Sequence, residues 1–351
     1  MTATPFLSVV MPARNAAAHI DRALRALRRS RFADFEIIVV DDASADGTAE
    51  IVRRFRPDLH LVLPEQGGAD HARNNGALRA RGEVVVFVDA DVAVAPDTLG
   101  RVAALFRNRE RQAVFGIYGL AQPHGNVCTL YKNAWIRHTF LGVGPRVGWF
   151  FTGFGAVRRS AWERCGGFLS GFRVETGGGD LAFGQRLARS GAPIELDRSL
   201  EVTHLKRFGF LALLRNDLRR AYGWSRLALR SGRSASRAPR KGFANVPGSF
   251  VLGVGLVGLG ALVVALTLTL VPAGWPILLP LLALHTILAA PFYGYLRANL
   301  PWKVTAAAIP LMLADHLACG VGVAAGLVKH AITLEATDRN EERAPQWDGL
   351  G

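Results

Sequence analysis

The chain has 351 residues, enough for two or three domains, and its formal net charge is +14. Residues 1–241 hold 37 of the 42 Lys and Arg residues and 22 of the 28 Asp and Glu residues, whereas residues 242–296 hold none of these. We therefore expect a charged globular part followed by a membrane part. The three cysteines lie far apart without Cys-x-x-Cys spacing, which argues against a disulfide framework or a zinc site and fits a reducing compartment.

Short apolar runs alternate with amphipathic helical patterns along the first ninety residues. Strands are expected at residues 7–11, 37–40, 60–63 and 84–88, and helices at residues 16–30, from Thr48 onward and at 70–81. Thr48 or Asp46 can cap the second of these helices. The alternation predicts an α/β fold with a doubly wound, mostly parallel sheet and right-handed crossovers.

Three of the expected strands end in polar clusters. These are Pro12, Ala13, Arg14 and Asn15 after the first strand, Asp41 and Asp42 after the second, and Asp89, Ala90 and Asp91 after the strand at 84–88. Ligands of open α/β sheets bind beyond the carboxyl ends of the strands, so we expect the clusters to meet in one crevice. No dinucleotide or P-loop motif follows these strands.

The two carboxylates of Asp89 and Asp91 stand at positions i and i+2. In an extended segment such side chains point the same way, and they repel each other unless a cation lies between them. A hard divalent ion, Mg²⁺ or Mn²⁺, shared with substrate phosphates fits this pattern. For an isolated Asp-x-Asp, a polar turn that closes the strand is the alternative.

Four motifs in this order resemble the nucleotide-sugar half of family-2 glycosyltransferases, which have the GT-A fold. They are Ser8-Val-Val-Met-Pro-Ala-Arg-Asn15, Val39-Val-Asp-Asp-Ala-Ser-Ala-Asp-Gly-Thr48, Ala72-Arg-Asn-Asn-Gly76 and Phe87-Val-Asp-Ala-Asp91. The resemblance implies a nucleotide-diphosphate sugar donor of the UDP or GDP type, bound with a divalent metal. The family often has an aromatic residue where Arg14 stands, which leaves the base open.

The same resemblance implies roles for single residues of the donor half. Asp42 would hydrogen-bond the nucleotide base, and Arg73 would lie near the nucleotide. Asp91, helped by Asp89, would hold the metal on the diphosphate. The cluster from Pro12 to Asn15 and the small residue Ala90 would complete the donor site.

Residues 151–168 resemble the family's segment that lines the donor sugar and the acceptor, and Gly153 lies within it. Further on, Asp180 matches the general base of the family's Glu-Asp-x-x-x-x-x-Arg pattern, although Gly179 replaces the first acid and Glu175 is a possible substitute. An inverting displacement needs such a carboxylate beside the acceptor hydroxyl. A helix N-cap is the alternative role for Asp180. His204 is expected either to contact the diphosphate or acceptor or to be structural.

Residues 206–241 contain eleven Lys and Arg residues and one acid, Asp217, interleaved with aromatic and leucine residues. This composition suits an amphipathic, polybasic juxtamembrane segment on the anionic cytoplasmic leaflet better than a solvated linker or a nucleic-acid site. Spans are expected at 249–271, 277–296 and 304–328. Pro310, Asp315 and His316 interrupt the last of these, so it can also be bent or lie at the interface.

The expected organisation is a catalytic domain at 1–205, the juxtamembrane segment at 206–241, two or three transmembrane helices at 249–328 and a polar tail at 329–351. Within the catalytic domain, residues 1–95 form the donor half and 96–205 the acceptor half. We expect a multi-pass protein of the inner membrane with its catalytic domain in the cytoplasm, three spans placing the tail outside.

The leading functional hypothesis is a membrane-bound, metal-dependent, inverting glycosyltransferase acting on a lipid-linked or polysaccharide acceptor. A polyprenyl-phosphate glycosyltransferase and a catalytically inactive nucleotide-sugar-binding subunit are the alternatives. A processive synthase is disfavoured because the Gln-x-x-Arg-Trp motif is absent. Nucleic-acid binding is not expected, because the positive charge clusters beside the membrane part.

Overall fold

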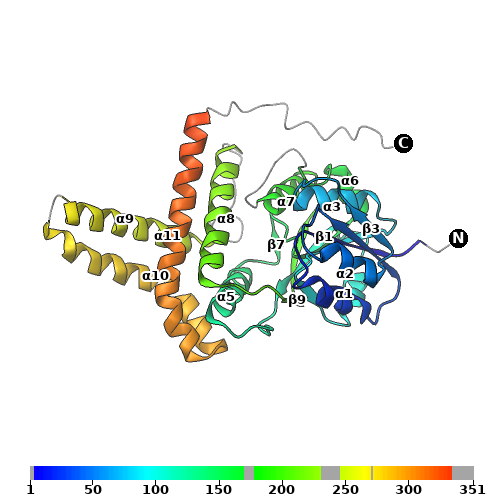
Figure 1. Cartoon of the computed structure of the whole chain (residues 1–351), viewed down its shortest axis with the longest axis horizontal. Coiled ribbons are helices and arrows are strands. Elements are labelled where there is room, and N and C mark those ends of the chain that lie inside the picture. Colours follow the sequence, from blue (N-terminus) through cyan, green and yellow to red (C-terminus); the bar gives the residue numbers. More distant parts are fainter. Residues whose placement is uncertain (1–3, 170–177, 231–245, 270–271, 334–351) are drawn as a thin grey trace.

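The computed structural model describes residues 4–169, 178–230, 246–269 and 272–333 (Figure 1). The strands are β1 (Leu7–Ala13), β2 (Phe35–Asp41), β3 (Leu59–Val62), β4 (Val84–Val88), β5 (Val92–Val94), β6 (Ala113–Tyr118), β7 (Arg146–Val147), β8 (Phe154–Arg158) and β9 (Ile194–His204). The helices of the globular part are α1 (Ile20–Arg28), α2 (Thr48–Phe55), α3 (Ala69–Leu78), α4 (Thr98–Phe106), α5 (Val127–Leu141), α6 (Arg159–Arg164) and α7 (Gly179–Arg189). The later helices are α8 (Phe210–Arg230), α9 (Gly248–Thr269), the 3₁₀ helix η2 (Pro272–Ile277), α10 (Leu278–Asn299) and α11 (Trp302–Thr333).

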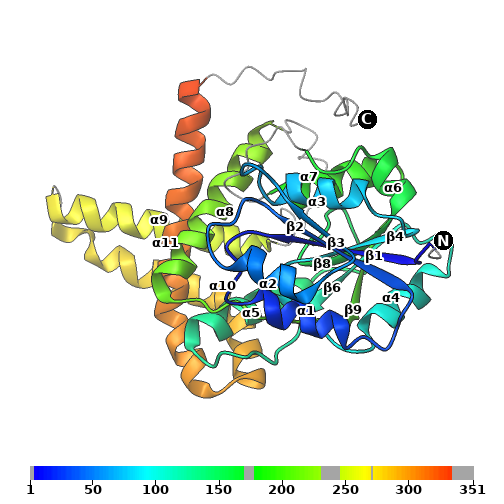
Figure 2. The same ribbon diagram turned by 45° about the vertical axis from the view of Figure 1, so that its right-hand side comes forward.

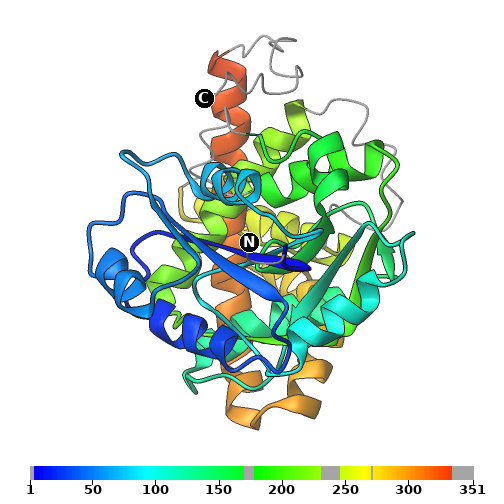
Figure 3. The ribbon, with the colours of Figure 1, turned by 90° about the vertical axis from the view of Figure 1, so that its right-hand side faces the viewer.

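One mixed sheet organises the globular part, in the order β3-β2-β1-β4-β8-β6-β9-β5, with β7 paired to β9. The first four strands are parallel, so the expected parallel, doubly wound sheet is confirmed for the donor half. Beyond β4 the sheet is mixed, because β8 runs antiparallel to both β4 and β6. Helices cover both faces (Figure 3). Every residue of β1 and β4 is buried, which explains their continuous apolar runs.

The expected cap of α2 is corrected by the structure. Its N-cap residue is Gly47, and no side chain caps it. The Thr48 hydroxyl instead accepts a hydrogen bond from the Ala16 amide (2.8 Å), while the Asp46 carboxylate accepts one from the Thr48 amide (3.0 Å). The Asp46 carboxylate also accepts a bond from the Ala17 amide (3.1 Å), so both side chains tie the loop after β1 to the start of α2, close to the expected donor site.

The helices after β9 form two pairs that cross each other. In Figures 1 and 2, α8 runs beside α11, whereas the hairpin of α9 and α10 projects across them, away from the sheet. Glycines bring α8 and α11 close together: a Cβ on Gly322 would lie 2.3 Å from the Leu218 carbonyl oxygen, and one on Gly326 would lie 2.0 Å from the Ser225 hydroxyl. Small residues at such positions let helices pack closely.

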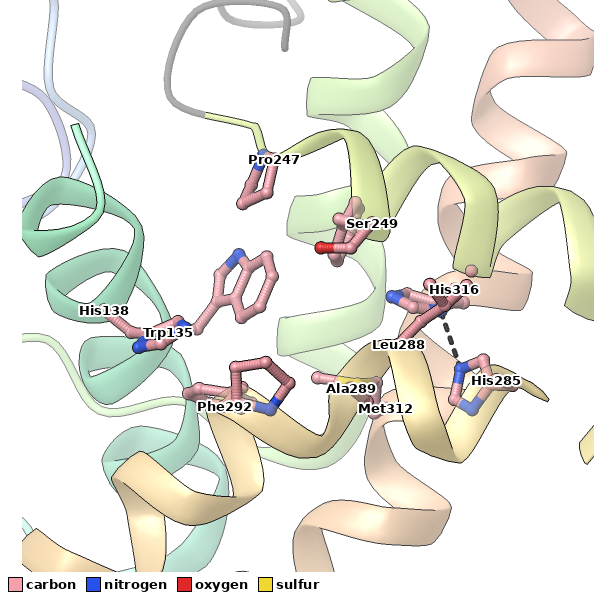
Figure 4. A pocket seen from close by; sticks show the side chains of 13 residues that line it. Trp135, His138, Pro247, Ser249, His285, Leu288, Ala289, Phe292, Met312 and His316 are labelled. Atoms are coloured by element: carbon pink, nitrogen blue, oxygen red, sulfur yellow. Dashed lines mark hydrogen bonds between the residues drawn. The ribbon is translucent and has the colours of Figure 1, made fainter. Parts of the chain in front are cut away.

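By length and apolar character, three helices could each cross a membrane: Gly248–Thr269, Trp275–Asn299 and Trp302–Ile332. α11 continues unbroken through Pro310. Asp315 and His316 are buried against protein, since the Tyr131 hydroxyl bonds Asp315 (3.1 Å) and His316 pairs with His285 (2.9 Å). Figure 4 shows this histidine pair at one end of a small cavity of about 40 Å³.

Candidate active site

The loops after β1 and β2 lock together at the carboxyl edge of the sheet. The Arg14 guanidinium donates to the carbonyl oxygens of Asp42 (2.5 Å) and Ala43 (3.2 Å). Asn15, with a positive φ of 47°, donates its amide to the Ser44 hydroxyl at 2.9 Å. The first two polar clusters expected from the sequence, including Pro12 and Ala13 at the end of β1, therefore lie side by side.

Asp42 is almost fully buried and holds the loop that precedes α3. Its carboxylate accepts hydrogen bonds from the backbone amides of Gly67 (2.7 Å) and Gly68 (2.9 Å). Gly68 has a φ of +91°, a conformation that strongly favours glycine. Each carboxylate oxygen keeps a further lone pair, so Asp42 can also accept a bond from a ligand.

Arg73 of α3 joins two carboxylates at the base of the site. Its guanidinium donates to Asp70 (2.9 Å) and to Asp89 (2.8 Å), and the Arg73 side chain is only 8% exposed. Its Nε has no hydrogen-bond partner among the described residues. Burial opposes the charge on Arg73, but Asp89 and Asp70 outweigh it and raise the pKa, so the guanidinium stays charged.

The acidic pair differs from the expected geometry. β4 ends at Val88, and the backbone turns at Ala90 and Asp91, with the Val92 amide bonded to the Asp89 carbonyl at 3.0 Å. Because the segment is not extended, the two carboxylates have different partners: Asp89 pairs with Arg73, and Asp91 faces His204, with 3.6 Å between the Asp91 Oδ2 and the His204 Nε2.

His204, at the end of β9, is buried and held in a fixed orientation. Its ring stacks on Tyr118, with centroids 4.4 Å apart, and its Nδ1 lies 2.7 Å from the Asn133 Oδ1. The Asn133 amide nitrogen donates to the Thr129 carbonyl (3.0 Å), so its oxygen must face the ring. Nδ1 therefore donates to Asn133, and Nε2 is the ring nitrogen that faces Asp91.

The surroundings of Asp89 and Asp91 shift the pKa values of the two carboxyl groups in opposite directions. Burial raises the pKa of Asp89, with Asp91 adding to the rise and Arg73 opposing it. Burial acts the same way on Asp91, but His204, Lys206 and His19 outweigh it and lower the pKa of Asp91. Asp91 is therefore the member that stays ionised as the pH falls.

Some of these side chains could serve as ligands of a divalent cation. Among the described residues no group of three His, Cys, Asp or Glu side chains is arranged as a metal site. Asp91 is 25% exposed, and its Oδ2 lies 3.6 Å from the His204 Nε2, so a cation placed between them could contact both atoms. Mg²⁺ and similar ions commonly take one or two protein ligands and complete their shell with substrate phosphates and water.

Asp180 lies in the first turn of α7, where it cannot be the N-cap. The N-cap is Gly178, with a φ of +118°, so the capping interpretation is wrong. The half-buried Asp180 carboxylate accepts a hydrogen bond only from the neighbouring Leu181 amide (2.8 Å) among the described residues. Burial is the first cause that raises the pKa of Asp70, and the nearby charge of Asp180 adds to it. The charge of Asp180 also adds to those of Asp89 and Asp70 in raising the pKa of Arg73.

The glycine before Asp180 has a specific neighbour. A Cβ on Gly179 would lie 1.5 Å from the Oδ2 of Asp70, so the Asp70 carboxylate occupies the space where a side chain at 179 would begin. Asp70 is the acid that the sequence analysis did not single out, because it belongs to α3, more than a hundred residues away. Glu175, the substitute considered there, lies outside the described residues.

We expect the fold to tolerate an acidic side chain at position 70 or at position 179, but not at both. Asp70→Ser leaves one bond of the buried Arg73 unmade and should lower the free energy of unfolding by about 1–3 kcal/mol. Gly179→Glu should clash with Asp70, whereas Asp70→Ser/Gly179→Glu should recover most of the lost stability and sugar transfer. Denaturant unfolding and transfer assays of the three variants check this, and a double variant worse than both single ones contradicts it.

The remaining expected acceptor residue, Gly153, lies beside the acidic pair. Its carbonyl oxygen accepts from the Asp89 amide (3.2 Å), and a Cβ there would lie 2.5 Å from the Phe151 ring and 2.9 Å from the Tyr118 hydroxyl. The sequence analysis also missed His19 and Lys206 as neighbours of Asp91. Only the convergence of α1 and of the segment after β9 brings them there.

Comparisons with known proteins agree with this architecture. Residues 8–207 match the model of the family described as "Glycosyl transferase family 2". Validoxylamine A glucosyltransferase of Streptomyces hygroscopicus subsp. jinggangensis is 30% identical over 228 residues, 55% of this chain and 54% of that protein. Glycosyltransferase AglE of Haloferax volcanii is 33% identical over 132 residues, 36% of this chain and 43% of that protein. The chain thus spans about half the length of these curated relatives.

A solved structure is similar over most of the chain. The mannosyltransferase PcManGT from Pyrobaculum calidifontis, solved in complex with GDP-Man and Mn²⁺, aligns with a TM-score of 0.56 and 22% identity over 93% of this chain and 88% of that one. At this identity the likeness shows the fold. The family model covers more than half of the 351 residues. The protein is therefore a glycosyltransferase of family 2 with a GT-A-type fold.

Proposed function

We propose that the protein is a membrane-bound, metal-dependent, inverting glycosyltransferase that uses a nucleotide-diphosphate sugar. The observation that carries this proposal is the chain of contacts in which Arg73 bridges Asp89 and Asp70, while Asp70 abuts Gly179, the residue before Asp180. A chain of neighbouring side chains therefore links the donor-side acidic pair to a separate acceptor-side carboxylate. That separation is what a single inverting displacement requires.

On the donor side, the residues would bind and orient the nucleotide. Asp42 would accept a bond from the base, and the unpartnered Nε of Arg73 would face the phosphates. Asp91, with His204 as a second ligand and Asp89 in support, would hold Mg²⁺ or Mn²⁺. When bound, the cation supplies positive charge to the leaving diphosphate. Lys206, whose charge helps to lower the pKa of Asp91, adds to this cationic environment.

On the acceptor side, Asp180 would act as the general base. It would take the proton of the acceptor hydroxyl as the oxygen attacks the anomeric carbon on the face opposite the diphosphate. Gly153, packed against Phe151 and Tyr118, would leave room for the sugar between the two sides. A polyprenyl phosphate acceptor, the alternative, attacks through an ionised oxygen and would need no base.

Incubation of native membranes with a panel of labelled UDP and GDP sugars, followed by lipid extraction, tests the proposal. We expect divalent-metal-dependent transfer of label from one donor to the lipid or glycan fraction. An inactive nucleotide-sugar-binding subunit would bind a donor and transfer nothing from any of them.

The arrangement of the helices favours two spans over three. α9 and α10 have 22 residues each, about 33 Å as helices, enough to cross the hydrocarbon core of about 30 Å. α11 crosses this hairpin and lies beside α8, which carries the exposed Arg215 and Arg219 (Figure 2). We infer that the hairpin inserts, while α8 and α11 lie along the membrane surface.

This topology places both ends of the chain in the cytoplasm, at variance with the three-span expectation. A reporter fused after Gly351 should therefore read cytoplasmic, as should one at Arg297 or Lys303, and one in η2 should read on the other side. A C-terminal reporter that reads outside restores the third span at α11. The positive residues at the base of the hairpin agree with a cytoplasmic base.

A further inference from the structure

We propose that a cavity between α5, α8, α9 and α11 binds the membrane lipid that carries the acceptor, its chain between the helices and its phosphate at Arg220. The inference rests on the proposed glycosyltransferase function and names the acceptor class. The cavity has a volume of about 260 Å³ and lies at the base of the α9–α10 hairpin. It adjoins the small cavity of Figure 4, and Trp135 and Phe250 line both.

The walls of this cavity are apolar on the membrane side. Val251 and Val254 of α9 and Val323 of α11 line it, with Phe250 of α9 and Ala228 of α8. These α9 residues lie in the first third of a helix long enough to span a bilayer. A lipid chain could therefore enter from the membrane without crossing water.

The opposite end of the cavity adjoins the candidate general base. Trp224 of α8 lines the cavity, and a Cβ on Gly178 would lie 3.5 Å from its indole ring. Gly178 caps α7 two residues before Asp180. An acceptor seated along Trp224 would thus have its headgroup at the start of the helix that carries Asp180. The cavity therefore lies next to the start of the helix that carries Asp180.

The positively charged side chain of Arg220 lies beside Trp224 in this cavity. Arg220 lines the cavity, lies over the Trp224 ring at 4.8 Å and forms no ion pair among the described residues. Burial raises the pKa of Tyr118 beside His204, and Arg220 is close enough to oppose that rise. The neighbouring Lys132 is buried and paired with Asp217, so its charge is already compensated. Asp217 also lines the cavity and is near enough to interact with the charge of Arg220, but no ion pair joins the two among the described residues, so the Arg220 guanidinium can still donate to a phosphate.

Cross-linking tests occupancy without any requirement for turnover. The full-length protein in phosphatidylcholine vesicles is irradiated with a photoreactive isoprenoid phosphate or with the matching neutral alcohol. We expect the phosphate to label α8, α9 or α11 and Val254→Trp, which fills the cavity, to reduce labelling at least tenfold. Leu252→Trp, two residues earlier on α9 and outside the cavity lining, is the matched control and should label normally.

The outcomes separate the lipid site from the enzyme activity. Arg220→Gln should remove the preference for the phosphate over the alcohol, with calorimetric donor binding unchanged in all three variants. Equal labelling by the alcohol in the wild-type protein, or normal labelling of a Val254→Trp variant that still binds donor, overturns the proposed site. Normal lipid labelling without transfer from any nucleotide sugar would instead reject the glycosyltransferase function alone.

Discussion

Asp91→Asn should abolish detectable sugar transfer and most metal-dependent donor binding. Asparagine keeps the size of the side chain but removes the charge that faces His204. A neutral amide is a weak ligand for Mg²⁺ or Mn²⁺, and without the cation the leaving diphosphate loses its main electrostatic stabilisation. Loss of one such stabilising group typically costs about 10²–10³-fold in rate, which is the least we expect here.

Calorimetry of nucleotide binding with and without Mn²⁺ gives the direct measurement. Asp97→Asn is a suitable control, because Asp97 is an exposed acid of the same segment whose nearest cation is Arg101 at 3.8 Å. It should leave binding and transfer unchanged. Mn²⁺-dependent nucleotide binding of wild-type strength in Asp91→Asn would refute the assignment of the metal to Asp91.

The donor half could be predicted from the sequence because its elements are identified by patterns among neighbouring residues. β1 and β4 are buried on both faces, so their apolar runs stand out from the neighbouring helical patterns. In a parallel sheet the polar residues that follow such strands must meet at one edge. The contact between Arg14 and Asp42 follows from that rule, whereas the pairing of Arg73 with Asp89 does not, because Arg73 lies on a helix.

The pairing of Asp70 with Gly179 could not be predicted in this way. It depends on how α3 and α7, which lie more than a hundred residues apart in the sequence, approach each other. The turn at Asp91 likewise escaped the i, i+2 argument, which assumed that the chain stays extended beyond the end of the strand at Val88. Its partner His204 comes from β9, which pairs with β5 directly after Asp91 although more than a hundred residues separate them in the sequence.

The arrangement of the membrane helices could not be predicted from the sequence either. Hydropathy identified three apolar segments within one or a few residues of α9, α10 and α11. Their relative directions depend on close packing at single glycines, such as Gly322 against Leu218, which composition does not reveal. Hydropathy alone therefore could not separate a helix that crosses the membrane from one that lies along it.

Asp180→Asn should lower sugar transfer by about 10²–10⁴-fold, the usual effect of losing a general base. The amide keeps the shape of the side chain and leaves the donor-side contacts of Arg73 with Asp70 and Asp89 in place. Binding of donor and metal should therefore stay at wild-type strength. Folding should also change little, since Gly178 and not Asp180 is the N-cap of α7.

The same substitution separates the two acceptor chemistries. A hydroxyl acceptor must lose a proton, so its transfer depends on the Asp180 carboxylate, whereas a phosphate acceptor is already ionised and does not. Near wild-type transfer to a lipid phosphate by Asp180→Asn, with loss of transfer to a lipid-linked sugar, would make the polyprenyl-phosphate reaction the physiological one. Near wild-type transfer to both acceptors would remove Asp180 from the mechanism, and Asp70, its buried neighbour at Gly179, would be the next carboxylate to test.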